Sequence, residues 1–380
     1  MSTFTTSNTS TPLQPLYAGL FALLMLVATA VPAQAQMDDG ELPSIDFAVN
    51  VAQHAQYLSL ENADDPIAGF QRIRAGLNAN VQFSENVSAL VMLEQEPNDF
   101  GFQTVTPAVD FVILDVALNE NLTFRTGSPV TGLMNFRGYS DGPVVQGNPL
   151  VGNSPADMIT AGQGVKLIGA FDTFGFDLTI NKGFGGALTT ADGTTNTGLN
   201  YIGKVRFTGS DLVKVGAGVA FQSGNQGLVF ATGDGDNYDA QVGTRATHAQ
   251  LPNETILHAD AKVTAGSADL DFWGGYATQS DVYAGNDSDY EALFFGVGAK
   301  LNLTDAFHLA GRYTYAGNQS DAVDNVNDAA LDRIQLGLGT KVYDHAMFKL
   351  EYVYQNEGNT NLSGVGQNWQ GVTTELSFNF

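Results

Sequence analysis

The sequence predicts one fold class: a closed, all-β barrel of sixteen antiparallel strands that spans a membrane. Three observations predict it. The last eleven residues alternate apolar and polar side chains up to a terminal Phe380. The same alternation recurs in segments along the chain. Short polar turns and long polar loops alternate as the connections between these segments. Alternation with a period of two is typical of a strand with one apolar and one polar face.

The C-terminal segment, residues 370–380 (QGVTTELSFNF), shows this pattern most clearly. One face carries Val372, Thr374, Leu376, Phe378 and Phe380. The other face carries Thr373, Glu375, Ser377 and Asn379. An exposed apolar edge strand invites aggregation in a soluble protein. A closed barrel pairs its last strand with its first, so we expect this segment to be the sixteenth strand, with Glu375 facing the interior.

The N-terminal segment, residues 1–35, is interpreted as a signal peptide. An apolar run over residues 16–31 is followed by Ala33-Gln34-Ala35, a small-residue cleavage site. The segment lacks Lys and Arg before Tyr17, which departs from the usual basic start. A retained membrane helix is the alternative, and the short apolar run disfavours it. We therefore expect export to the outer membrane and a single barrel domain over residues 36–380.

Connections of two kinds alternate along the mature chain. The short turns are expected at 84–86, 119–121, 172–175, 208–211, 265–268, 302–305 and 343–345. The long loops are expected at 57–68, 95–107, 127–157, 184–197, 223–253, 278–289, 316–329 and 355–370. Asn, Asp, Gly and Ser in the short turns supply turn chemistry. Membrane barrels show this asymmetry, with short periplasmic turns and long extracellular loops.

Residues 70–83 illustrate the expected strands between these connections. Apolar side chains recur at every second position from Ile73 to Phe83, and Arg72, Arg74 and three amides occupy the positions between them. Aromatic residues gather near both ends of the strands, as they do at the two membrane interfaces of a barrel. A soluble β-solenoid or sandwich is the alternative, and it explains neither the two aromatic belts nor the alternating loop lengths.

Charge and composition narrow the function classes. The chain has 40 acidic and 16 basic residues and a formal net charge of −24, which argues against nucleic acid as a partner. It has no cysteine, which excludes disulfides and thiolate chemistry. The basic residues expected to face inward and line the pore are Arg72, Arg74, Arg125, Lys166, Lys204, Arg206, Lys214, Lys262, Lys300, Arg312, Arg333, Lys341 and Lys349. The inward acids are Asp46, Glu94, Asp115, Asp177, Asp260, Asp269, Asp271, Glu351 and Glu375.

These inward charges have two interpretations. Unpaired ions in a dry core are costly, so the wall predicts a water-filled channel with a mildly basic bore beneath an acidic mouth. Alternatively, the charges form a ladder of ion pairs that satisfy one another. The two arrangements can coexist, and the opposed charges of mouth and bore leave the sign of ion selectivity open.

Signals for catalysis or metal binding are weak. The five histidines are scattered without an HExxH spacing, and His258 and His308 are expected to face inward as pore-lining residues. Asp234, Asp236 and Asp239 resemble part of a calcium loop, but no Glu follows at the required spacing, which favours a solvated acidic loop. We expect no enzyme activity, no cofactor and no metal.

The mature chain resembles Gram-negative general porins and their phosphate-selective relatives. The resemblance rests on the terminal Phe380, the sixteen-strand count and residues 122–132 (LTFRTGSPVTG), similar to the strand-to-loop entry of those families. It implies that Phe378 and Phe380 form the signal read by the barrel-assembly machinery, that outer-membrane lipid surrounds the barrel, and that a homotrimer forms.

The resemblance also implies that the third long loop, 127–157, folds into the barrel and narrows the pore. Arg137, Tyr139 and Asp141 would then lie on the constricting loop, facing basic wall residues such as Arg72, Arg74 and Arg125. The chain lacks the Pro-Glu-Phe-Gly-Gly pattern of the best-known general porins. A surface flap is the alternative path for this loop.

These observations predict a passive diffusion channel for small hydrophilic solutes and ions. One alternative is an adhesin or receptor that uses loops 127–157 and 223–253 as a binding platform. Another is an outer-membrane hydrolase, which predicts fewer strands and a Ser/His or Asp/His cluster at one rim.

Overall fold

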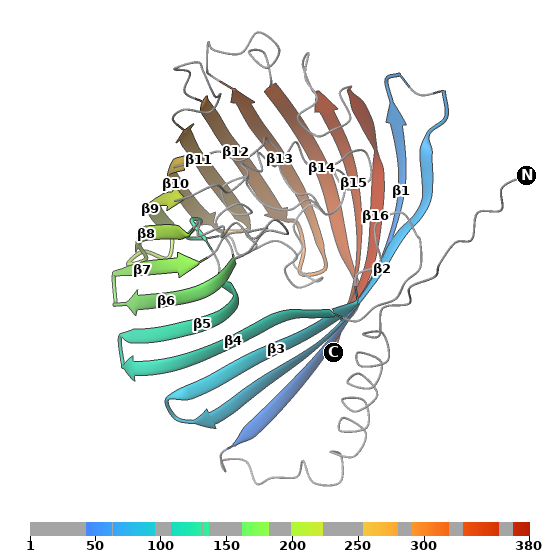
Figure 1. Cartoon of the computed structure of the whole chain (residues 1–380). Helices are drawn as coiled ribbons and strands as arrows, with labels where there is room; N and C mark the ends of the chain where they lie inside the picture. The colour runs from blue at the N-terminus through green and yellow to red at the C-terminus, as the bar shows by residue number, and fades with distance from the viewer. Residues whose placement is uncertain are drawn as a thin grey trace, which may run out of the picture.

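The computed structural model describes residues 43–62, 64–95, 108–130, 132–136, 162–181, 199–222, 254–279, 290–318, 330–356 and 368–380. They form sixteen strands in one closed barrel, in which β1 pairs with β16 and every other strand pairs with its neighbours in sequence (Figure 1). All sixteen pairings are antiparallel. The predicted fold class is therefore confirmed.

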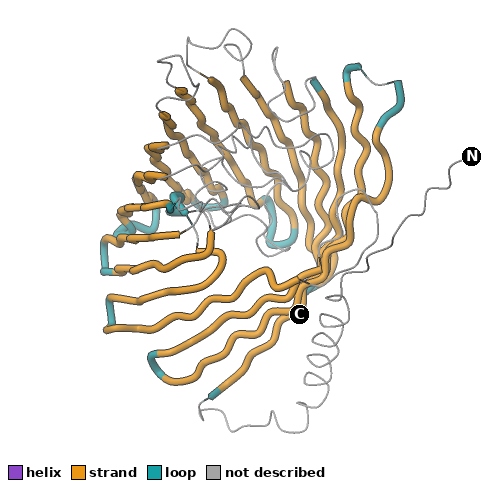
Figure 2. Tube along the Cα trace, viewed as in Figure 1, coloured by secondary structure: helices purple, strands orange, loops and turns teal. Residues whose placement is uncertain are grey.

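Strands make up nearly all of the described chain, joined by short loops (Figure 2). Their bounds are β1 Ser44–Leu60, β2 Ile67–Ser84, β3 Val87–Gln95, β4 Ala108–Asn119, β5 Leu122–Val130, β6 Gly162–Ala170, β7 Phe174–Asn181, β8 Asn200–Phe207, β9 Val213–Gln222, β10 Glu254–Ala265, β11 Ala268–Gln279, β12 Tyr290–Asn302, β13 Phe307–Asn318, β14 Ala330–Tyr343, β15 Ala346–Asn356 and β16 Trp369–Asn379. Within the described ranges no helix is long and apolar enough to cross a membrane.

Each predicted short turn joins two strands of a hairpin, and polar side chains close several of them. The side-chain oxygen of Asn119 accepts hydrogen bonds from the backbone N–H groups of Asn121 and Leu122, at 2.9 and 3.0 Å. The Thr304 hydroxyl accepts from the N–H of Phe307 at 3.0 Å. Gly266 has a φ of +60°, a left-handed conformation that suits glycine in the tight turn between β10 and β11.

The first connection is shorter than predicted. The sequence pattern predicts a loop over 57–68, whereas β1 continues to Leu60 and β2 begins at Ile67. The alternation of exposure also continues, because Tyr57 is exposed and Leu58 is fully buried. Pairing with β16 extends as far as Leu60 opposite Trp369, and these ladder hydrogen bonds hold the extra residues in the strand.

The two faces of the wall differ in chemistry. Large apolar side chains are exposed on the outside, as for Leu178, Leu257 and Leu336 at 55, 54 and 58%. The alternate positions face the interior and bury polar groups such as Gln335 and Glu351, which are at most 1% exposed. A barrel with an apolar exterior and a polar interior suits a lipid bilayer around it.

The terminal strand occupies its predicted place. β16 pairs with β1 along its length, with Leu376 opposite Gln53 and Phe378 opposite Val51. Glu375 faces inward and is 5% exposed, whereas Phe380 is 67% exposed on the outer side. The segment that shows the clearest alternation in the sequence thus closes the barrel.

Candidate functional site: the inner wall of the barrel

The structure describes eleven of the thirteen predicted pore-lining side chains, and all eleven lie at inward positions. They are Arg125, Lys166, Lys204, Arg206, Lys214, Lys262, Lys300, Arg312, Arg333, Lys341 and Lys349. Arg72 and Arg74 belong to β2, but their side chains lie outside the described residues. Contact of these groups with a permeating solute stays a prediction.

Asp177 on β7 is the centre of the largest charge cluster among the inner-wall residues that the structure describes. Its carboxylate lies 3.6 Å from Lys166 Nζ, 3.3 Å from Lys204 Nζ and 2.7 Å from a guanidinium nitrogen of Arg206. The strand register brings these groups together, because Asp177 lies directly opposite Lys204 on β8. One carboxylate thus serves three cations, which leaves the cluster positive.

Other inward charges form closer pairs or stack on aromatic rings. Arg125 donates two hydrogen bonds of 2.7 Å to the two oxygens of Asp115, a bidentate pair. Lys349 Nζ lies 2.9 Å from Glu375. The only two tryptophans of the chain also face inward, where Arg312 lies over Trp273 and Arg333 over Trp369, each 5.7 Å from the ring centroid. Part of the wall is therefore the predicted ladder of mutually satisfied charges.

The start of the third long loop, residues 132–136, is docked on the inner wall. Lys204 Nζ donates hydrogen bonds to the backbone carbonyls of Gly132 at 3.0 Å and Met134 at 2.6 Å. Leu133 and Met134 are 0 and 3% exposed. We call residues 132–136 the docked segment.

Asp260 on β10 holds the other end of the docked segment. Its carboxylate accepts from the backbone N–H of Asn135 at 2.7 Å, from the side-chain amide of Asn135 at 2.8 Å and from the N–H of Phe136 at 3.1 Å. Hydrogen bonds to charged groups are stronger than neutral ones. The segment is therefore tied to β8 by a cation and to β10 by an anion.

Two inward glycines on β9, between those anchors, make room for the segment. A Cβ at Gly216 would overlap the side-chain amide of Asn135, and one at Gly218 would lie 2.7 Å from Cδ1 of Leu133. A side chain at either position would force Asn135 or Leu133 to shift, whereas glycine leaves room for both. We call Gly216 and Gly218 the glycine cradle. Inward glycines at alternate positions of one strand are the sequence signal for such a cradle.

The predicted constriction residues Arg137, Tyr139 and Asp141 follow the docked segment directly and lie outside the described residues. The same holds for Asp234, Asp236 and Asp239 of the acidic loop. Among the residues that the structure describes, no group of three His, Asp or Glu side chains is placed to hold a metal ion.

His258 is buried on the inner wall, with Nε2 3.9 Å from the carboxylate of Asp260. This is a His–Asp pair, the kind of arrangement that the hydrolase alternative predicts at a rim. The carboxylate is already occupied by Asn135 and Phe136, and no described hydroxyl is hydrogen-bonded to His258. The barrel also has sixteen strands rather than the smaller number that a hydrolase predicts.

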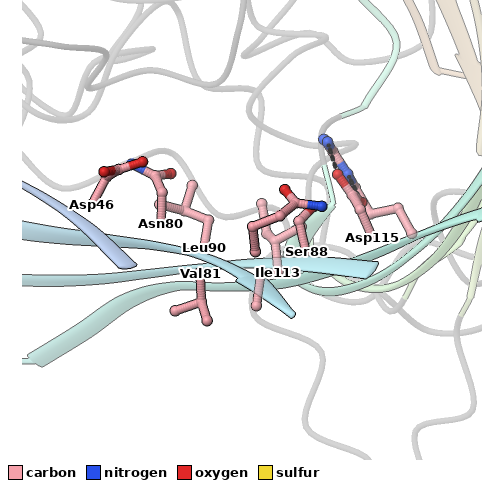
Figure 3. A pocket seen from close by; sticks show the side chains of 10 residues that line it. Asp46, Asn80, Val81, Ser88, Leu90, Ile113 and Asp115 are labelled. Atoms are coloured by element: carbon pink, nitrogen blue, oxygen red, sulfur yellow. Dashed lines mark hydrogen bonds and ion pairs between the residues drawn. The ribbon is translucent and has the colours of Figure 1, made fainter. Parts of the chain in front are cut away.

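A recess of about 350 Å³ lies along β1–β5. Asp46 and Asn80 lie side by side at one end and Asp115 at the other, whereas Val81 points away to the other side of the sheet (Figure 3). Leu90 and Ile113 lie between them. The recess is a polar hollow with an apolar floor on the inner wall.

A closed barrel of sixteen antiparallel strands, apolar outside and charged inside, is the fold of outer-membrane porins. No protein-family model matches the chain, and no curated protein matches its sequence. The chain is similar in structure to an anion-selective porin from Comamonas acidovorans, with a TM-score of 0.60, 15% identity, and coverage of 89% of this chain and 100% of that one.

Two further solved structures share the fold. The outer membrane channel DcaP of Acinetobacter baumannii matches with a TM-score of 0.60 and 11% identity over 89% of this chain and 97% of that one. OmpT in trimer form, an outer membrane protein of Vibrio cholerae, matches with a TM-score of 0.56 and 16% identity over 90% of this chain and 100% of that one. At such low identities, the structural similarity shows a common fold and nothing more specific.

Proposed function

We propose that the protein is an outer-membrane porin through which small hydrophilic solutes and ions diffuse passively. The observation that carries the proposal is the chemistry of the wall. Its outside is apolar, and its inside bears basic side chains at the eleven predicted pore-lining positions that the structure describes. Charged side chains are stable there when water or ion pairs satisfy them. The solute gradient drives the flux, so no catalytic group is required and the protein is not an enzyme.

Purified protein in a planar lipid bilayer tests this function. Stepwise increases in conductance are expected as single channels insert. Silence under all salt and voltage conditions would exclude a porin and favour the adhesin or receptor interpretation.

The third long loop is proposed to narrow this channel. Support comes from the docked segment, whose hydrogen bonds to Lys204 and Asp260 direct the chain inward just before Arg137. Arg137, Tyr139 and Asp141 would then face the bore. Arg137→Ala should change the single-channel conductance, and a variant that conducts like the wild type would contradict a constricting role.

Location and assembly complete the proposal. Residues 1–35 would direct export and be removed, and Phe378 and Phe380 would be read by the barrel-assembly machinery. A homotrimer is proposed because a structurally similar outer membrane protein has a trimer form. N-terminal sequencing of the protein from isolated outer membranes, and its mass in detergent, test these points separately.

A further inference from the structure

Lys214 on β9 and Lys262 on β10 lie directly opposite one another on the inner wall. Lys262 continues the inward row of His258 and Asp260, and Lys214 lies two residues before the inward Gly216. Both side chains are half-buried. Like charges at directly opposite positions of two strands destabilise a sheet. We call these two residues the lysine pair.

No acid among the described residues forms an ion pair with either lysine. Asp260, the nearest acid along β10, is occupied by the docked segment. Asp271 on β11 lies opposite Lys262 in register, but its carboxylate leans the other way, over Gly298 on β12. Asp269 accepts a hydrogen bond of 2.8 Å from the Thr264 hydroxyl. No acid in the described part of the chain therefore neutralises the lysine pair by direct contact.

Five other basic groups of the inner wall differ in this respect because each lies beside an acid. The guanidinium of Arg125 is paired with Asp115, and Lys166, Lys204 and Arg206 share Asp177. Lys349 is paired with Glu375. The field of a close ion pair falls off rapidly with distance, whereas that of an unpaired charge extends over the screening length, about 8 Å at 0.15 M salt. An ion in the bore therefore responds more strongly to the lysine pair.

We propose that the lysine pair selects anions in this channel, a proposal that rests on the porin function above. The solutes are small inorganic anions and short carboxylates. A lysine ammonium is a compact charge on a flexible stem with three donors, so two of them attract an anion without fixing its geometry. Conduction requires such weak binding, because the ion must leave again.

Further charges on the inner wall modify this selectivity. Lys300 on β12 and Lys341 on β14 also lack an ion-pair partner within the described ranges, and both lie near the short turns, as the lysine pair does. Asp46 on β1, across the ring of strands from β9, and Asp271 oppose them. The lysine pair differs from all of these because two charges of one sign occupy facing positions.

The reversal potential in a tenfold KCl gradient across a planar bilayer tests the proposal. The wild type is expected to prefer chloride. The double variant Lys214→Gln/Lys262→Gln should lose this preference, with the chloride-to-potassium permeability ratio falling by about threefold or more. The double variant Lys214→Arg/Lys262→Arg retains both charges and should retain the preference. Circular dichroism of each purified variant checks that the barrel has folded.

The outcomes separate the two proposals. A folded wild type that never conducts would overturn the porin function itself. A wild type that conducts but prefers potassium would overturn the role of the lysine pair and leave the channel intact. An unchanged reversal potential in the glutamine variant would do the same.

Discussion

Lys204 Nζ donates a 2.6 Å hydrogen bond to the backbone carbonyl of Met134, which joins the inner face of β8 to the loop that follows β5. The same ammonium donates to Gly132 and lies 3.3 Å from Asp177. A single buried cation thus connects the docked segment to the charge cluster of the wall. Its three N–H donors match these three acceptors.

Replacing this cation should release the docked segment. Lys204→Met preserves the length of the side chain but removes both hydrogen bonds to the loop, at a cost of roughly 1.5–3 kcal/mol for each bond. We expect noisier open-channel current and a changed mean conductance. Single-channel recording measures both. Lys300→Met, which removes an inward lysine without an ion-pair partner among the described residues, is the control and should not increase the noise.

The glycine cradle, Gly216 and Gly218, leads to a second, independent prediction for the docked segment. Gly216→Val adds a side chain where Asn135 lies, and overpacking of this kind costs roughly 1–3 kcal/mol. The strand itself should tolerate valine well, so we expect displacement of the segment rather than loss of the barrel.

Gly203→Val is the matched control for Gly216→Val. Gly203 lies on the outer face of β8, where the nearest atom to an added Cβ is Leu178 Cδ2 at 3.9 Å. Protease susceptibility of the 132–136 region in the folded barrel distinguishes the two variants. Equal protection in both would show that the cradle does not hold the segment.

The alternation of side chains was sufficient to predict the barrel. Because a strand has a period of two, Leu376 and Glu375 could be assigned to opposite faces from the sequence alone, and the structure confirms both. The closing pair of strands followed from the same reasoning, since an apolar final strand needs a partner.

The candidate site was less predictable, for physical reasons. Alternation assigns a residue to a face but does not specify the stagger between strands that places Lys204 opposite Asp177. The contact between Asn135 and Asp260 joins residues 125 apart in sequence, and no local pattern encodes it. The sequence marks these side chains only as inward. The fold places some of them beside an acid and leaves others, the lysine pair among them, without an ion-pair partner among the described residues.

Both tryptophans provide a spectroscopic test of which face meets lipid. Trp273 and Trp369 are 4 and 1% exposed and face inward. Their fluorescence should therefore not be quenched by lipids with brominated acyl chains when the barrel is in a vesicle. Leu336→Trp places a third tryptophan on the outer face, where Leu336 is 58% exposed, and its added emission should be quenched. Strong quenching of the wild type would contradict the assignment of the faces.

The terminal residue should matter for assembly through both its backbone and its ring. The N–H of Val49 donates to the carbonyl of Phe380 at 2.9 Å, and the N–H of Phe380 donates to the carbonyl of Val49 at 2.8 Å. Deleting Phe380 removes both hydrogen bonds at the seam where the barrel closes, together with the stacking of its ring on His345. We expect slower folding and a lower folded yield in lipid vesicles, measured by circular dichroism over time.

Two substitutions separate the contributions of the backbone and the ring of Phe380. Phe380→Ala preserves the backbone pairing with Val49 and removes the ring, whereas Phe380→Tyr preserves both. One possibility is that the ring anchors the strand at the membrane interface, as aromatic girdles do. The alanine variant should then fold as poorly as the deletion variant, and the tyrosine variant should fold normally. If alanine folds like the wild type while the deletion fails, closure depends on the two hydrogen bonds and not on the aromatic group. Normal folding of all three would exclude Phe380 as an assembly signal.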